Sequence, residues 1–180
     1  MPTTIPDEQL RNTGAGHVRY VALNAEAVVI DQRAVNLAGT VLAIAFTGAQ
    51  CDIPRSLIVD DNGVGAGNTG NITVTGLNEA GVATVEVIAI NTLGVVESNA
   101  AFTYISQIDY PAITDTNVEV QMGSKVGIAT DFTLNALTSI AKNGVFMLPA
   151  AFTLDPANAT VEETGVPIVA ADTFDYYLYS

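Results

Sequence analysis

Side chains of the kinds that act as nucleophiles, bases or metal ligands are few in this 180-residue chain. His17 is the only histidine, and Cys51 is the only cysteine. Multi-histidine metal sites and cysteine zinc clusters therefore lack their ligands, and no serine or cysteine stands at a recognised spacing from His17. We expect His17 to be exposed to solvent and Cys51 to be a small packing residue.

Carboxylates occur in two adjacent pairs, Asp60-Asp61 and Glu162-Glu163. Neighbouring side chains of an extended chain point to opposite faces, so neither pair predicts the converging carboxylates of glycoside hydrolysis. We expect solvated loop charge at both pairs. Asp60, Asp61 and Asn62 also offer oxygen ligands for calcium, but their spacing departs from the Asp-x-Asp-x-Asp-Gly loop. We leave calcium open at this loop and predict no catalytic, cofactor or metal site.

A glycine-rich segment occupies residues 60–70. It lacks the Gly-Lys-Ser/Thr ending of a P-loop and the Gly-x-Gly-x-x-Gly fingerprint. A strand is predicted after it, where a phosphate site needs the N-terminus of a helix. The segment therefore predicts a hairpin loop.

The elements that position these residues are predicted to be short strands. β-Branched residues dominate short runs that Gly, Asn, Asp and Pro separate, and neither Ala25–Ala38 nor Asp131–Ile140 shows a sustained helical period. The predicted strands are Val18–Leu23, Ala27–Asp31, Thr40–Phe46, Ser56–Val59, Asn71–Thr75, Ala83–Ile90, Ala101–Ile108, Val118–Gln121, Val126–Ile128, Leu137–Ala141, Val145–Leu148, Ala159–Glu162 and Phe174–Tyr179. This pattern predicts an all-β protein, an antiparallel β-sandwich or a barrel-like fold.

Two hairpins carry recognisable turn chemistry. Ile72 and Val74 alternate with threonines, Val85 and Val87 alternate with Thr84 and Glu86, and a loop ending in a glycine joins the two runs. This period of two predicts a half-buried antiparallel pair. Asn143-Gly144, between two apolar runs, predicts a type I′ turn.

The chain divides into an arm and one β-rich domain. Residues 1–18 contain two prolines and show no period of either kind, so we predict an extended N-terminal arm. Residues 19–180 form the structural domain. A weak change of composition at 111–117 is a possible division between two β lobes.

Composition indicates that partner subunits cover part of the surface. Charged residues make up 14% of the chain and hydrophobic residues 49%, with a mean hydropathy of +0.36. Soluble monomers usually carry about 25% charged residues. So few charges leave too little polar surface for a lone domain. Either an unusually large fraction of apolar surface faces water, or partner subunits cover some of it, and we predict the second, a homo-oligomer or an assembly component.

Charge and hydropathy argue against two other classes of partner. The net charge is −13, the isoelectric point is near 4.1, and the six basic residues are scattered, so nucleic acid is not an expected partner. The most apolar window, Leu37–Phe46, is too short to cross a bilayer, so no membrane partner is expected. The first residues also lack the pattern of a signal peptide.

Contact regions are predicted at the two ends of the chain. The arm holds apolar and basic residues, and the C-terminal run carries the densest aromatics, the residue type that dominates interface hot spots. The alternative for this run is a last strand packed on the core. The candidate interface residues are Ile5, Leu10, Arg11, Arg19, Tyr20, Phe174, Tyr176, Tyr177 and Tyr179.

Three segments resemble small β-rich structural proteins of tailed-phage particles. They are the hairpin Ile72-Thr-Val-Thr-Gly-Leu-Asn-Glu-Ala-Gly-Val-Ala-Thr-Val-Glu-Val-Ile, the run Ser98-Asn-Ala-Ala-Phe-Thr-Tyr-Ile-Ser-Gln-Ile, and Val126-Gly-Ile-Ala-Thr-Asp-Phe-Thr-Leu. The resemblance covers roughly residues 57–150. It implies a capsid decoration (cement) protein, often a trimer, that binds the major capsid protein or another virion protein and reinforces the shell.

The function predicted on this basis is structural. The protein is expected at the capsid surface of a bacteriophage virion after synthesis in the host cytoplasm. The alternative is a tail, neck or fibre component that binds a receptor through exposed loops such as 60–70. An enzyme is not expected, because the sequence offers no converging carboxylates and no nucleophile with a base.

Overall fold

The computed structural model describes residues 15–33, 42–46, 48–62, 66–115, 117–128, 137–164 and 166–179. These residues form fourteen strands and one short 3₁₀ helix, Pro149–Ala151, and they contain no α-helix. Every strand pairing is antiparallel. The predicted antiparallel all-β fold is therefore confirmed. Residues 1–14 of the predicted arm, with Ile5, Leu10 and Arg11, lie outside the described residues.

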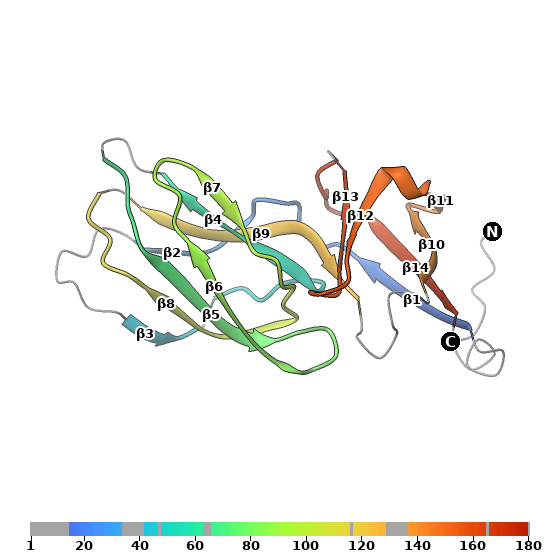
Figure 1. Ribbon diagram of the computed structural model, residues 1–180, viewed down its shortest axis with the longest axis horizontal. Helices are drawn as coiled ribbons and strands as arrows, with labels where there is room; N and C mark the ends of the chain where they lie inside the picture. Colours follow the sequence, from blue (N-terminus) through green and yellow to red (C-terminus); the bar gives the residue numbers. More distant parts are fainter. Residues whose placement is uncertain are drawn as a thin grey trace.

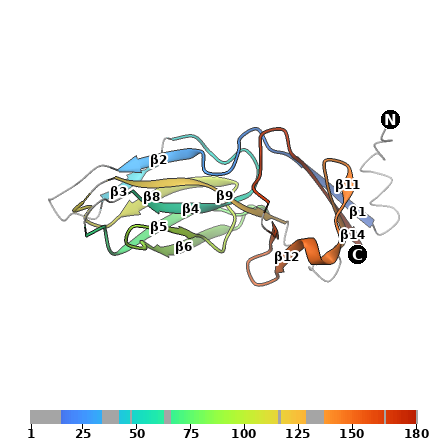
Figure 2. The same ribbon diagram turned by 90° about the horizontal axis from the view of Figure 1, so that it is seen from above.

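The larger lobe is a β-sandwich, and Figure 2 shows its two layers. One sheet places β9 between β2 and β4 and has β7 at its edge; the other has the order β3-β8-β5-β6. The strands of the first sheet are β2 (Val29–Arg33), β4 (Arg55–Asp61), β7 (Val95–Glu97) and β9 (Val118–Gly127). Those of the second are β3 (Leu42–Ala45), β5 (Asn71–Leu77), β6 (Ala83–Ala89) and β8 (Tyr104–Tyr110).

The smaller lobe combines segments from both ends of the chain, and both ribbon views show it beside the sandwich (Figures 1 and 2). Its sheet has the order β1-β14-β10-β11, and a further hairpin, β12–β13, pairs with the end of β9. The strands are β1 (Ala15–Val21), β10 (Leu137–Lys142), β11 (Val145–Phe146), β12 (Phe152–Asp155), β13 (Thr160–Glu163) and β14 (Thr173–Tyr179).

Each lobe has its own hydrophobic core. The sandwich buries Leu57, Ile72, Phe102 and other side chains of its two sheets, and the smaller lobe buries a separate cluster that includes Tyr176. Residues 111–115 connect β8 to β9 within the sandwich, and Ile113 belongs to the sandwich core.

Strand β9 joins the two lobes. Its first residues pair with β2 and β4 in the sandwich, whereas Val126 and Gly127 pair with β13 (Figure 1). The sequence predicted two strands here with a break between them, and that prediction was wrong. Gly123 keeps the strand continuous, because a Cβ at this position would lie 2.3 Å from Ser56 Oγ and no larger residue fits against β4.

Several other strand boundaries differ from the prediction, and two strands were missed. β1 begins at Ala15, before the predicted Val18, because pairing with β14 extends it through residues of low strand propensity. β7 and β12 were not predicted. β7 pairs with β4 through only three residues, Val95–Glu97, which is too short a run for a period of two to be recognised.

Candidate functional site

The predicted contact residues of β1 and β14 are neighbours in one sheet. Tyr20 pairs with Phe174, and Arg19 pairs with Asp175. Phe174 and Tyr176 are buried in the core of the smaller lobe, and the rings of Tyr20 and Tyr176 meet edge to face at 5.9 Å. These two side chains of β14 therefore pack on the core, which was the alternative for this run, and they are not accessible to a partner.

Arg19 and Tyr177 lie on the other face of the sheet, since they alternate with the core-facing residues of β1 and β14. Arg19 Nε lies 3.7 Å from Asp175 Oδ1, with the arginine side chain exposed. Tyr177 is half-buried, and its ring lies 5.5 Å from that of Phe146. Of Tyr179 only the backbone is described, paired with Ala15. Tyr20 turns its hydroxyl toward the sandwich and donates a hydrogen bond to Glu79.

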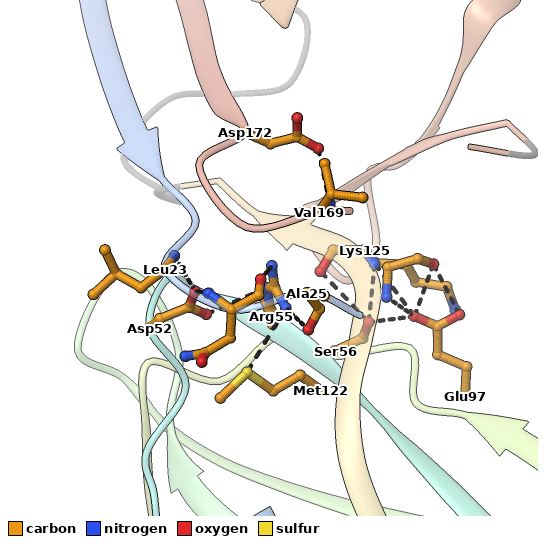
Figure 3. Close-up of polar contacts among 12 residues, drawn as sticks. Leu23, Ala25, Asp52, Arg55, Ser56, Glu97, Met122, Lys125, Val169 and Asp172 are labelled. Carbon is orange, nitrogen blue, oxygen red and sulfur yellow. Dashed lines mark hydrogen bonds and ion pairs between the residues drawn. The ribbon is translucent and has the colours of Figure 1, made fainter. Parts of the chain in front are cut away.

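A buried arginine lies at the junction of the two lobes (Figure 3). Arg55 begins β4 and is fully buried, and its guanidinium donates to the carbonyl oxygens of Asn24 at 2.8 Å and Ala25 at 3.1 Å. Its Nε lies 3.4 Å from Asp52 Oδ1. The other oxygen of Asp52 accepts hydrogen bonds from the N–H groups of Leu23 and Asn24. The pair thus fixes the turn that leads from β1 to β2.

The charges at this junction have a structural role. Burial lowers the pKa of Arg55, and Asp52 opposes that shift, so the guanidinium stays ionised beside its counter-ion. Burial also raises the pKa of the neighbouring Cys51 thiol to about 12, although Arg55 opposes this. Cys51 packs against the sandwich core as a neutral thiol, which is not the thiolate that nucleophilic chemistry needs.

A second polar cluster lies at the register shift between β4 and β9, and Figure 3 shows it beside Arg55. Glu97 Oε1 accepts hydrogen bonds from Ser56 Oγ at 2.5 Å and from the N–H groups of Ser124 and Lys125 at 2.7 and 3.2 Å. The Lys125 ammonium donates to the carbonyl oxygen of Ser98. Ser56 is fully buried and donates to a carboxylate, so this cluster closes an irregular ladder and offers no accessible nucleophile.

The expectation of solvated loop charge at Asp60-Asp61 was wrong. Both residues belong to β4, and Asp61 is buried because Asn68 and Leu93 pack against its carboxylate. The Asp61 carboxylate accepts hydrogen bonds from the N–H groups of Asn68 and Leu93 and from the Asn68 side chain. Asp60 instead accepts one from Gln121. Within the described ranges, no three His, Cys, Asp or Glu side chains gather as a metal site.

Glu162 and Glu163 also lie in a strand, β13, and they diverge. Glu162 accepts a hydrogen bond from Ser124, whereas Glu163 lies 2.6 Å from the Lys142 ammonium. The second carboxylate near Lys142 is Asp172, whose Oδ2 is 3.1 Å away. Burial lowers the pKa of Lys142, but hydrogen bonds to Glu163 and Asp172 outweigh it, so that the pKa is raised.

Lys142, Glu163 and Asp172 line an open recess of about 490 Å³ in the smaller lobe. The recess starts at the predicted β10–β11 turn, which is confirmed, since Asn143 and Gly144 have φ values of 52° and 76° as type I′ requires. Its wall is largely apolar. We call it the Lys142 recess; it is lined by Lys142, Asn143, Val145, Met147, Glu163, Val166, Pro167, Val169 and Asp172.

Large apolar side chains are exposed in and near this recess. Val145, which lines it, is 69% exposed. Phe146 is 65% exposed on the other face of the sheet, where it meets Tyr177, and Leu148 beyond it is 75% exposed. Val166 and Val169 extend the apolar surface across the recess. The sequence contains this signal as an apolar run after Asn143-Gly144, but the run was interpreted only as a strand.

A second apolar surface lies on the outer face of the sandwich, along β6. Val85 and Val87 of β6 are 63% and 59% exposed, whereas Ile88 is buried. The register pairs Val74 with Glu86, so the even-numbered positions of β6 face inward. Glu86 lies at the sandwich edge, where its carboxylate accepts hydrogen bonds from the N–H groups of residues 99 and 100.

Comparisons with protein-family models, with curated proteins and with solved structures found no match. Among the described residues, no helix is long and apolar enough to cross a membrane.

Proposed function

We propose that this protein is a structural component of a phage virion, of the capsid decoration or cement type, which binds the shell through protein contacts. The supporting observation is the pair of exposed apolar surfaces, one on each lobe, in a chain with few charges. Contiguous apolar surface on a soluble protein is typical of interaction sites. The polar clusters around Arg55, Glu97 and Asp61 are closed on themselves, in keeping with a scaffold role.

The Lys142 recess is the docking surface in this proposal. Exposed Val145, Val166 and Val169 line a recess that also contains Lys142 and two carboxylates. An apolar rim supplies contact energy, about 25 cal/mol per Å² of apolar area removed from water. The charges of Lys142, Glu163 and Asp172 in the lining restrict which partner side chains enter, as polar groups do in binding pockets.

The junction between the lobes supports the same role. The Arg55–Asp52 pair, the Tyr20–Glu79 hydrogen bond and the continuous β9 each connect the sandwich to the smaller lobe or to the turn between them. A body held at several points loses little conformational freedom on docking, so more of the contact energy appears as affinity. Repeated over many symmetric copies, modest contacts then reinforce a shell.

Electron microscopy of virions labelled with an antibody against this protein tests the proposal. We expect label over the whole capsid surface. Label confined to the tail or neck would replace the decoration role by the tail alternative, and its absence from purified virions would refute a virion role altogether.

A binding experiment tests the docking surface. Virions lacking the protein are incubated with wild-type protein, with Val145→Lys, or with Val95→Lys, whose valine is 61% exposed on the sandwich. We expect Val145→Lys to lose at least tenfold in affinity and Val95→Lys to bind like the wild type. Equal binding by all three would remove the Lys142 recess from the proposal.

A further inference from the structure

Strand β6 has one unpaired edge. It ends the sheet order β3-β8-β5-β6, and of the strands that the structure describes it pairs with β5 alone. Hydrogen bonds from Ile90 N to Gly70 O at 2.9 Å and from Asn78 N to Val82 O at 3.0 Å show that the even-numbered residues direct their backbone groups toward β5. In an antiparallel ladder the alternate residues direct theirs outward. The N–H and C=O groups of the odd-numbered residues of β6 therefore point away from β5, toward the open edge of the sheet.

The same odd-numbered residues also expose their side chains. Ala83, Val85, Val87 and Ala89 all lie on the outer face of the sheet. Open edges in natural sheets are usually protected by charge, proline or a covering element. The only charge in β6 is Glu86, and its side chain faces inward and is hydrogen-bonded to the loop at residues 99 and 100.

We propose that β6 pairs antiparallel with β6 of a second copy of this chain, so that two four-stranded sheets become one of eight strands. The inference rests on the proposed assembly function and names its self-association contact. A second copy fits this edge, because its outward-facing residues, Ala83, Val85, Val87 and Ala89, are uncharged and a two-fold axis brings them opposite one another without opposing like charges. The net charge of −13 on each chain opposes the association and contributes to its weakness. A basic partner would gain nothing from the alanines and valines of β6.

One register fits this edge best. With Val85 opposite Val85 of the second copy, Glu86 faces Thr84, whereas a shift by one pair places the two Glu86 carboxylates opposite each other, which is unfavourable. The chosen register pairs residues 83, 85 and 87 with 87, 85 and 83 and forms about six backbone hydrogen bonds. It also gathers four valines on the outer face.

The size of this contact indicates a weak dimer. Seven residues of strand extend over about 23 Å, and an edge contact of that length lies at the small end of specific interfaces. We expect dissociation in about the micromolar range. A two-fold contact closes at two copies, in place of the trimer that the phage resemblance implies.

Sedimentation equilibrium of the purified chain across a concentration series tests the pairing. The wild type should be a dimer, and Val85→Lys should raise the dissociation constant at least tenfold, because it places two ammonium groups opposite each other. Val145→Lys is the matched control, since that valine is 69% exposed on the other lobe, and it should dimerise like the wild type. Circular dichroism should show unchanged strand content in both variants.

Cysteine cross-linking tests the register. In the proposed dimer the Cα atoms of the two Val85 residues are about 5.5 Å apart, within disulfide range, whereas those of the two Val87 residues are about 14 Å apart. Copper-catalysed oxidation should therefore link Val85→Cys into a covalent dimer. Val87→Cys and the wild type, with only Cys51, should stay unlinked.

Three results would overturn the pairing. They are a wild type that stays monomeric at about 100 µM, where a micromolar dimer is mostly formed, a dimer or trimer that Val85→Lys leaves intact, and cross-linking of Val87→Cys instead of Val85→Cys. None of these affects binding of Val145→Lys to virions. Failure of the edge pairing is thereby distinguished from failure of the proposed function.

Discussion

Removing the Arg55 side chain should destabilise the junction between the lobes more than any surface change. Arg55→Ala leaves the Asp52 carboxylate, whose side chain is 2% exposed, without its cation. It also removes the donors to two backbone carbonyl oxygens, those of Asn24 and Ala25. Breaking a buried ion pair by removal of one partner costs about 3–5 kcal/mol.

Urea unfolding followed by circular dichroism measures this effect. With a slope of about 2 kcal/mol per M, the expected loss lowers the midpoint by about 1.5–2.5 M. The double variant Arg55→Met/Asp52→Asn is the control, because it replaces the pair without leaving a charge unpaired, and it should recover part of the loss. A midpoint shift below about 0.5 M for Arg55→Ala, which corresponds to about 1 kcal/mol, would refute the role given to this pair.

Three further changes test other parts of the structure. Gly123→Ala should destabilise the protein by about 1–3 kcal/mol in the same assay, because its methyl group meets the β4 side chain and backbone within 3 Å; an unchanged midpoint would contradict this. Tyr176→Phe should be neutral or stabilise by about 1 kcal/mol, since the buried hydroxyl has no hydrogen-bond partner among the described residues; a marked loss would reveal a partner. Lys142→Met should reduce stability at neutral pH, and less so in acid. The pKa of Asp172 is lowered in the folded protein, so its contribution is present above about pH 4 and is lost as the pH falls further; midpoints measured between pH 3 and 7 test this.

The strands themselves were largely predictable from the sequence. Runs of β-branched residues between turn residues gave most strands to within a few positions, and Asn143-Gly144 gave the type I′ hairpin. These signals are local: each depends on a few neighbouring residues. The β-sandwich of the larger lobe follows from many such strands joined by short turns.

What the sequence did not reveal depends on distant partners. The alternation in β6 gives a period of two but not its phase, because Val85 and Glu86 fit either face until the position of the strand at the sandwich edge is known. Asp61 has the sequence pattern of a loop charge, and its burial depends on N–H groups of Asn68 and Leu93, which the sequence alone does not place beside it. The Arg55–Asp52 junction has no sequence signature, since its main acceptors are backbone carbonyl oxygens of another segment.

The pairing of β1 with β14 has a consequence for the order of folding. β1 stays without its neighbour until β14 has been synthesised, whereas β2 to β9 come from one continuous stretch and share their own core. Contacts between residues so far apart in sequence form slowly, because closing the long intervening loop is entropically unfavourable. The sandwich can therefore mature on the ribosome first, and the smaller lobe assembles afterwards against the exposed end of β9.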